Sequence, residues 1–356
     1  MLNLKELLKE AMMQKASDVH ISIGISPKIR VHGKLKTTNF PVMTMADTLE
    51  VLLSIVNPEQ REIFEEMGEI DISVSIPEVG RYRVNAYKQR SSIALAFRLV
   101  DLEIPRLEEL KIPKQIIDIC YRKHGMVFVT GPSGSGKSTV LATLIDHINS
   151  TREAHIITLE DPIEYLHQHK LSIVNQREVG LDTKNYESAL KAALREDPDI
   201  LQIGQMKDPV SMRTAFAAVE TGKLVFTSMH TPGVMETLQM IVDLFPLQEQ
   251  KQARNRLANV LSAIVSRQLC DSKDGGERIP AYEVMLVNNE IKDCIRRGNF
   301  EQIQKIMEAK DTENMIKMDD YLTDLVTKGK IDSQTAIQQS KDPEAMVKRL
   351  SGGSAN

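Results

Sequence analysis

A glycine-rich segment with a single lysine is the part of the sequence whose residue types and spacing point most directly to chemistry. It reads Gly-Pro-Ser-Gly-Ser-Gly-Lys-Ser-Thr over residues 131–139 and matches the pattern G-x-x-x-x-G-K-[ST]. Glycines let the backbone turn so that successive N–H groups face one anion, and Lys137 adds a full positive charge for the β- and γ-phosphates of a nucleotide. The Ser138 hydroxyl can ligate Mg²⁺. The predicted phosphate-binding residues are Gly131, Ser133, Gly134, Ser135, Gly136, Lys137, Ser138 and Thr139.

The segments on either side of this loop decide between a phosphate site and a glycine- and serine-rich loop before an ordinary helix. Residues 126–130 (Met-Val-Phe-Val-Thr) predict a strand, and residues 140–145 (Val-Leu-Ala-Thr-Leu-Ile) predict a buried helix. Strand, loop and helix in this order are the context that the motif requires, because the helix N-terminus adds its positive dipole end. The sequence therefore predicts a nucleoside triphosphate site.

A second polar cluster, Glu160-Asp161-Pro162-Ile163-Glu164, follows the next predicted strand. Asp161, Pro162 and Glu164 also fit the first positions of a capped helix, which is the alternative interpretation. Beside a P-loop, however, hydrolysis needs a carboxylate that polarises the attacking water. Glu164 is therefore the predicted catalytic base.

Two further polar clusters follow the predicted strands at 199–203 and 224–229. Gln205 lies where a P-loop ATPase normally carries an acid that holds Mg²⁺ or its water shell. An amide keeps the size and a carbonyl lone pair but has no negative charge, so both metal binding and catalysis should weaken. His230 is a candidate sensor of the γ-phosphate, with a purely structural role equally open.

Three arginines, Arg81, Arg83 and Arg98, fall on the polar faces of predicted strands near the N-terminus. A solvated sheet face is the ordinary explanation for such residues. Triphosphate hydrolysis, however, commonly recruits arginines from a neighbouring domain or subunit. All three are therefore candidate catalytic residues.

Hydrophobic periodicity divides the elements that must position these residues into two groups. Residues 1–100 combine helices at 2–14, 45–56 and 58–67 with segments of alternating polarity, which predicts a small α+β domain. Residues 101–112, bounded by prolines, predict a linker.

Beyond residue 113, strands and helices alternate along the chain, which predicts an α/β fold with a largely parallel sheet and ligands at the carboxyl ends of its strands. We assign 113–270 to this ATPase core. Beyond 233 almost everything is expected to be helical apart from 280–285, so 271–356 is assigned to a mainly helical C-terminal region.

Composition excludes several other classes of protein. With 356 residues, 42% hydrophobic and 26% charged, the chain should fold into two domains. A net charge of −4 and the absence of Trp argue against a nucleic-acid motor such as a RecA-like helicase. Its three cysteines are far apart, which indicates neither a zinc site nor a disulfide framework. With no signal peptide and no window of 18 apolar residues, a cytoplasmic location without direct membrane insertion is expected.

With these residues in view, the chain resembles the secretion-type ATPases and, within them, the type IV pilus retraction ATPases (the PilT family). The four-cysteine zinc insert common in pilus extension ATPases is missing, and Ile291–Gly298 looks like the C-terminal signature of the retraction family. The resemblance is carried by the segments 16–20, 81–86, 131–139, 160–164, 175–180, 193–199, 224–231, 281–285 and 291–298.

The resemblance implies a PAS-like N-terminal domain, a RecA-like P-loop ATPase domain, and a homo-hexameric ring with ATP between the two domains. It implies ATP and Mg²⁺ as ligands, with Lys137 and Ser138 at phosphate and metal, Glu164 as the catalytic glutamate and His230 in the family's His box. Arg81, Arg83 and Arg98 become candidate arginine fingers.

Members of the family couple ATP hydrolysis to disassembly of pilin filaments, which powers twitching motility. The resemblance therefore also implies partners: an inner-membrane pilus platform protein and, as further candidates, other pilus ATPases. The chain would then lie at the inner face of the cell membrane through these partners, with no nucleic acid bound.

Two departures from the family pattern bear on function. The family normally has Gly-Glu-Met-Arg-Asp where this chain has Gln205 and Lys207, and Gly-His where Lys223 follows Gly222. Gln205 could be an engineered substitution that traps ATP, or a feature of a natural subunit with slow turnover. A motor ATPase for pilus retraction is the first hypothesis; an ATP-binding, hydrolysis-poor ring subunit that regulates a partner pilus or secretion ATPase is the second.

Overall fold

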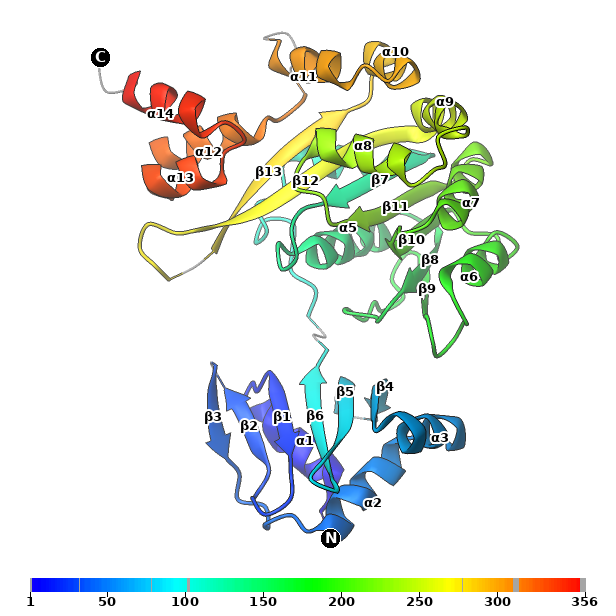
Figure 1. Ribbon diagram of the computed structural model, residues 1–356, viewed down its shortest axis with the longest axis vertical. Coiled ribbons are helices and arrows are strands. Elements are labelled where there is room, and N and C mark those ends of the chain that lie inside the picture. Colours follow the sequence, from blue (N-terminus) through cyan, green and yellow to red (C-terminus); the bar gives the residue numbers. More distant parts are fainter. Residues whose placement is uncertain are drawn as a thin grey trace. The chain divides into compact units, whose positions relative to one another are not determined.

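The computed structural model describes residues 2–31, 33–77, 79–100, 103–276, 278–309 and 314–352. The chain forms two compact units, Met1–Glu103 and Ile104–Asn356 (Figure 1). Asp101 and Leu102, which begin the predicted linker, lie outside the described residues, as do the last four residues of the chain.

The first unit is an α+β fold built on one antiparallel sheet of strand order β3-β2-β1-β6-β5-β4. Alternating polarity sets its two faces, as in β5, where Tyr82, Val84 and Ala86 are buried and Arg83 is exposed. The predicted helices and strands of this unit are confirmed. Its elements are α1 (Leu4–Met13), β1 (Asp18–Ile21), β2 (Lys28–Val31), β3 (Lys34–Thr37), α2 (Met45–Ile55), α3 (Pro58–Met67), β4 (Glu69–Ile76), β5 (Gly80–Gln89) and β6 (Ser92–Leu99).

The second unit contains a seven-stranded sheet of order β13-β12-β7-β11-β10-β8-β9, parallel except for β13 (Figure 1). Its inner strand β7 is buried on both faces, which is why Val127, Phe128 and Val129 form an uninterrupted apolar run. The strands are β7 (Gly125–Thr130), β8 (His155–Glu160), β9 (Ile173–Glu178), β10 (Ile200–Gln205), β11 (Leu224–Met229), β12 (Leu261–Asp271) and β13 (Arg278–Leu286).

Helices cover both faces of this sheet, as the alternating pattern predicts for a doubly wound α/β fold. One apolar cluster joins one face of the strands to α4 and α5, and a second joins the other face to α6 through α11. These helices are α4 (Lys114–Ile119), α5 (Lys137–Thr151), α6 (Tyr186–Ala193), α7 (Pro209–Glu220), α8 (Val234–Asp243), α9 (Gln250–Val260), α10 (Asn289–Arg297) and α11 (Phe300–Glu308).

Two strands of the sheet differ from the sequence-based expectations. Strand β12 lies in a region that we expected to be helical, and that expectation is wrong. Residues 261–267 of this strand are all buried because neighbours cover it on both faces, and continuous burial leaves no period in the sequence that separates strand from helix. Strand β9 was not predicted. The boundary predicted after residue 270 lies at the end of β12, whereas its hydrogen-bonded partner β13 lies beyond that boundary.

Residues 104–112 of the predicted linker are fastened to the second unit. Thr143 in α5 donates its hydroxyl to the Pro105 carbonyl at 2.9 Å, and Tyr282 in β13 donates its hydroxyl to the Leu110 carbonyl at 2.9 Å. Leu107 and Leu110 also pack against the apolar cluster beneath α5. This segment is therefore part of the second unit's packing.

Three helices near the C-terminus pack on the ends of β12 and β13 around Cys270, Ile279 and Leu322. One ion pair fixes them there: Lys341 Nζ lies 2.6 Å from an oxygen of Glu283, a buried carboxylate of β13. These helices are α12 (Met318–Thr327), α13 (Ser333–Gln339) and α14 (Pro343–Gly352). Within the described ranges, none of the helices is both long and apolar enough to span a membrane.

Candidate nucleotide-binding site

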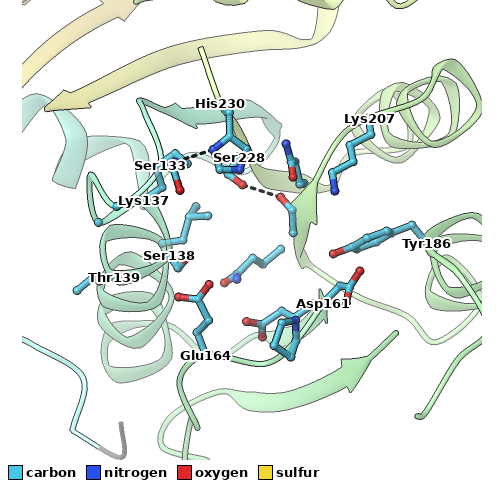
Figure 2. Close-up of a pocket in the computed structure, with 18 residues that line it drawn as sticks. Ser133, Lys137, Ser138, Thr139, Asp161, Glu164, Tyr186, Lys207, Ser228 and His230 are labelled. Carbon is cyan, nitrogen blue, oxygen red and sulfur yellow. Dashed lines mark hydrogen bonds between the residues drawn. The ribbon is translucent and has the colours of Figure 1, made fainter. Parts of the chain in front are cut away.

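A cavity of about 400 Å³ opens where β7, β8, β10 and β11 end (Figure 2). It brings together four of the clusters that the sequence singled out, including Glu164, Gln205 and His230. Gly131 and Ser135 of the predicted phosphate loop are not part of the lining. The lining residues are Ser133, Gly134, Gly136, Lys137, Ser138, Thr139, Leu141, Glu160, Asp161, Pro162, Glu164, Tyr186, Gln202, Gly204, Gln205, Lys207, Ser228 and His230.

The glycine-rich loop turns directly from β7 into α5, which begins at Lys137. Gly131 and Gly136 have φ angles of 143° and 81°, which L side chains rarely adopt. Gly131 also packs so tightly that an added Cβ would lie 2.2 Å from the Arg267 carbonyl oxygen. Glycine is therefore required at this position, and the N-terminus of α5 faces the cavity as an anion site.

Lys137 is held inside the loop by its own neighbours. Its Nζ donates to the carbonyl oxygens of Gly131 and Pro132 at 3.0 and 2.9 Å and lies 3.2 Å from His230 Nδ1. Burial lowers the pKa of Lys137, and the nearby charge of Glu164 opposes that shift. Because a lysine ammonium has only donors, His230 Nδ1 must accept, and the proton of a neutral ring is then on Nε2.

The pKa of His230 is lowered from its ordinary value of 6.5 by burial, and then by the positive charges of Lys137 and Lys207. The ring should therefore stay neutral at pH 7 and become charged only below pH 6.5, where protonation of Nδ1 would break the contact with Lys137. A histidine NMR titration, assigned by the signal missing in His230→Asn, should give a midpoint below 6.5. Lys207→Met should move that midpoint upward, and a midpoint at or above 6.5 in the unaltered chain would contradict the assignment.

Glu164 lies in an extended segment after β8, and its carboxylate points into the cavity near Ser138 (Figure 2). No helix begins at Asp161, so the helix-capping alternative is wrong. Strand β9 holds the segment from both sides: Glu178 accepts from the Ile163 N–H at 2.9 Å, and Gln176 donates to the Tyr165 carbonyl at 2.8 Å. The strand that was missed from sequence is thus the one that fixes the predicted base.

Nine of the lining residues were not predicted as site residues, and two of these, Glu160 and Tyr186, shape the cavity. Glu160 is buried at the end of β8, and burial raises its pKa although Thr158 and Gln176 donate to Oε1 at 2.6 and 3.1 Å. Tyr186 begins α6 and closes the cavity so tightly that a Cβ on Gly204 would lie 2.3 Å from its hydroxyl. The sequence offered one signal for Glu160, a charged residue at the end of an apolar strand, and none for Tyr186.

Gln205 ends β10 beside a register shift relative to β11. The Ser228 and Thr227 hydroxyls donate to the Gly204 carbonyl at 3.0 and 3.3 Å, which fixes the strand end just before Gln205. Asp208, by contrast, caps α7 and accepts from two of its first N–H groups. Its carboxylate therefore serves the helix, and the cavity has an amide at position 205.

The three candidate arginines lie in the first unit. Arg83 and Arg98 are directly opposite each other on β5 and β6, and their side chains are 51% and 75% exposed. Arg98 Nε pairs with Asp18 Oδ1 at 2.9 Å, and Arg83 Nη2 lies 3.9 Å from Asp71 Oδ2. Surface ion pairs of this kind contribute little to stability, so these cations can exchange partners at small cost. The catalytic role predicted for them and for Arg81 stays a prediction.

The oxygen atoms of the cavity suit a hard divalent cation. Mg²⁺ takes oxygen ligands and is usually held by few protein groups together with substrate phosphates and water. The Ser138 hydroxyl and the carboxylates of Asp161 and Glu164 line the same cavity. The site therefore fits Mg²⁺, with Ser138 as the expected protein ligand.

A glycine-rich loop between a buried strand and a helix, with carboxylates at neighbouring strand ends, defines the class of P-loop nucleoside triphosphatases. Comparison with known proteins gives the particular family. A family model described as "Type II/IV secretion system protein" matches residues 2–338, and the chain belongs to this family.

Three similar proteins have names that refer to twitching motility or to the type IV pilus. A "Twitching motility protein" from Neisseria gonorrhoeae is 39% identical over 320 residues, which cover 90% of this chain and 86% of that protein. The "Type IV pilus retractation ATPase PilT" of Pseudomonas aeruginosa is 39% identical over 321 residues, covering 89% and 92%. The type IV pilus ATPase PilU of the same organism is 36% identical over 321 residues, covering 90% and 84%.

Solved structures agree with this assignment. A crystal structure of the pilus retraction motor PilT with bound ADP superposes with a TM-score of 0.89 at 42% identity and covers 97% of this chain and 99% of that chain. The Legionella pneumophila ATPase DotB follows with a TM-score of 0.82 at 25% identity, covering 93% of each chain. The expected fold, an α/β ATPase unit with an N-terminal α+β unit and C-terminal helices, is thereby confirmed.

Proposed function

We propose that this chain is a motor ATPase that couples ATP hydrolysis to type IV pilus retraction. One observation carries the proposal: four separate chain segments place Lys137, Ser138, Glu164, Gln205 and His230 around a single cavity. The names of the similar proteins, a twitching motility protein and a pilus retraction ATPase, point to the same reaction and the same machine.

In this proposal the chain's own residues hold the triphosphate and direct water to it. The N–H groups of the loop and the N-terminus of α5 bind the phosphates, and Lys137 leaves its loop carbonyls to neutralise the β- and γ-oxygens. Glu164 accepts a proton from the attacking water. The unprotonated Nδ1 of His230 contacts Lys137, so His230 would lose this contact when Lys137 binds the phosphates. Mg²⁺, held by Ser138, would supply charge neutralisation across the phosphates.

The assembly belongs to the proposal as well. A homo-hexameric ring would let Arg81, Arg83 or Arg98 act on ATP bound by the second unit, with 1–100 as a PAS-like domain and 113–270 as the RecA-like core. An inner-membrane platform protein would receive the motion and hold the ring at the membrane from the cytoplasm, and another pilus ATPase is a further partner. The P. aeruginosa relative named PilU makes such a second ATPase reasonable.

Gln205 favours a second candidate function. If the missing negative charge lowers turnover far enough, the chain would bind ATP, change conformation and regulate a partner pilus or secretion ATPase without powering retraction itself. Both candidates need the same nucleotide site, so only the rate of hydrolysis and its biological output separate them.

The Gln205→Glu substitution tests which of the two functions applies. Restoring a carboxylate beside the phosphates should strengthen Mg²⁺ binding and raise steady-state phosphate release by about tenfold, the factor expected from one charge-assisted contact. Phosphate release is measured on the purified chain at saturating ATP. The Gln202→Glu variant, altered three residues earlier in the same strand, reports the effect of an added charge alone.

A cellular measurement completes this test. In cells that lack their own retraction ATPase, the unaltered chain should restore pilus retraction if it is the motor. If only Gln205→Glu restores it, the regulatory function is favoured. If neither chain hydrolyses ATP, the ATPase proposal is refuted.

A further inference from the structure

A buried arginine lies directly behind the glycine-rich loop. Arg267 of β12 is only 5% exposed, and its Nη1 donates to the Gly136 carbonyl at 2.8 Å. Arg267 packs against both ends of the loop, through its guanidinium at Gly136 and through its backbone at Gly131. A Cβ added to Gly136 would lie 2.3 Å from Nη1, and a Cβ added to Gly131 would lie 2.2 Å from the Arg267 carbonyl oxygen. Gly136 is the N-cap residue of α5 and immediately precedes Lys137, so the guanidinium contacts the residue just before the helix begins.

In the described part of the chain, Arg267 carries its positive charge without a paired carboxylate. Among residues 2–352, apart from the segments that the structure leaves undescribed, no carboxylate forms an ion pair with it, and its Nε has no hydrogen-bond partner. Its remaining contact is the face of Tyr282, with Cζ 5.7 Å from the ring centroid. Buried guanidinium groups are normally paired with carboxylates, because removing an unpaired charge from water costs several kcal/mol.

Tyr282 fixes this arrangement from the other side. It pairs with Arg267 in the β12–β13 register, is fully buried, and donates its hydroxyl to the Leu110 carbonyl. The ring therefore cannot turn away, and the guanidinium stays between the aromatic face and the loop. A cation–π contact offsets only part of the cost of removing this charge from water.

We infer that the charge which balances Arg267 is the phosphate chain of the bound nucleotide, acting across the backbone of the loop. Arg267 is then a positioning residue: it holds the Gly136 carbonyl away from the phosphates and adds a second buried positive charge behind Lys137. This inference rests on the proposed nucleotide site. Strand β12 contributes no residue to the cavity lining, but in this inference it contributes to phosphate affinity through Arg267.

The test compares nucleotide affinity in charge-altering variants of the full chain, measured by equilibrium dialysis with ATP and with ADP in excess Mg²⁺. Arg267→Met should weaken ATP binding by at least about tenfold and ADP binding by less, because ADP presents less charge. Arg267→Lys should recover part of the ATP affinity. Arg267→Gln keeps an N–H donor for Gly136 and covers the case in which the methionine variant does not fold.

Arg256→Met is the matched control. Arg256 also lies over an aromatic ring, with Cζ 5.4 Å from the Phe216 centroid, but its charge is already balanced by Glu220 at 2.7 Å. Its substitution should leave ATP affinity unchanged.

Several results would overturn the inference. Unchanged ATP affinity in both Arg267→Met and Arg267→Gln would do so, and so would equal losses for ATP and ADP with no recovery in Arg267→Lys, which would indicate a purely structural arginine. An unaltered chain that retains no ATP would refute the proposed function, and this inference with it.

Discussion

Replacing Lys137 with alanine is expected to abolish ATP retention and to lower steady-state phosphate release by about 100- to 1000-fold, the usual effect of removing one preorganised group that stabilises transition-state charge. Lys137 is the cation of the cavity that already lies within the loop, bonded to the Gly131 and Pro132 carbonyls. Alanine removes the charge and leaves the loop glycines unchanged, so the loss would be electrostatic. Dialysis with ATP and a phosphate-release assay measure the two effects.

Lys328→Ala is the control for this prediction. Lys328 follows α12 and pairs with Asp324 on the protein surface, with its side chain 63% exposed. The Lys328→Ala substitution removes one positive charge, as Lys137→Ala does, but at an exposed site where an ion pair contributes little to stability. If Lys137→Ala retained ATP as well as Lys328→Ala does, the phosphate loop would not be the nucleotide site.

The fold and the phosphate loop could be predicted because each rests on a local pattern. Period-two alternation predicted β2, β4, β5 and β6 of the first unit, and β5 shows the buried and the wet face most clearly. Strands β1 and β3 were not predicted, and β3 is exposed along its whole length. The loop was recognisable because a strand, a turn that needs glycine and a helix N-terminus must follow one another along the chain. The same argument placed Glu164 and His230 at one edge of the sheet, and both line the cavity.

What could not be predicted depends on contacts between distant segments. Strand β12 is buried from residue 261 to residue 267 because β7 and β13 cover its edges and helices cover its faces, so its sequence has no period to detect. Tyr186 enters the cavity from α6, where an aromatic residue at the start of a helix gives no functional signal. Arg267 belongs to the same group, since an arginine in an apolar run reveals its role only when the loop behind it is seen.

Glu164→Gln is the second large expected effect, and it should separate hydrolysis from binding. Gln176 and Glu178 of β9 fix the segment on either side of residue 164 through its backbone, so an amide of the same size should keep its place. Glutamine cannot accept a proton from water, and loss of a general base typically costs about 100- to 10,000-fold in rate. ATP should still be retained, because the phosphate loop and Lys137 are unchanged.

The measurement is best made in a Gln205→Glu background, where a higher starting rate leaves room for the fall. Glu187→Gln serves as the control: Glu187 lies on α6, its side chain is 44% exposed, and it forms an ion pair with Lys191. Phosphate release that survives in Glu164→Gln would transfer the role of base to another cavity carboxylate. Glu160 is the less suitable candidate. Burial raises its pKa, and Thr158 and Gln176 already donate hydrogen bonds to its Oε1, so this carboxyl group is held at the strand end. Asp161 would then be the residue to substitute next.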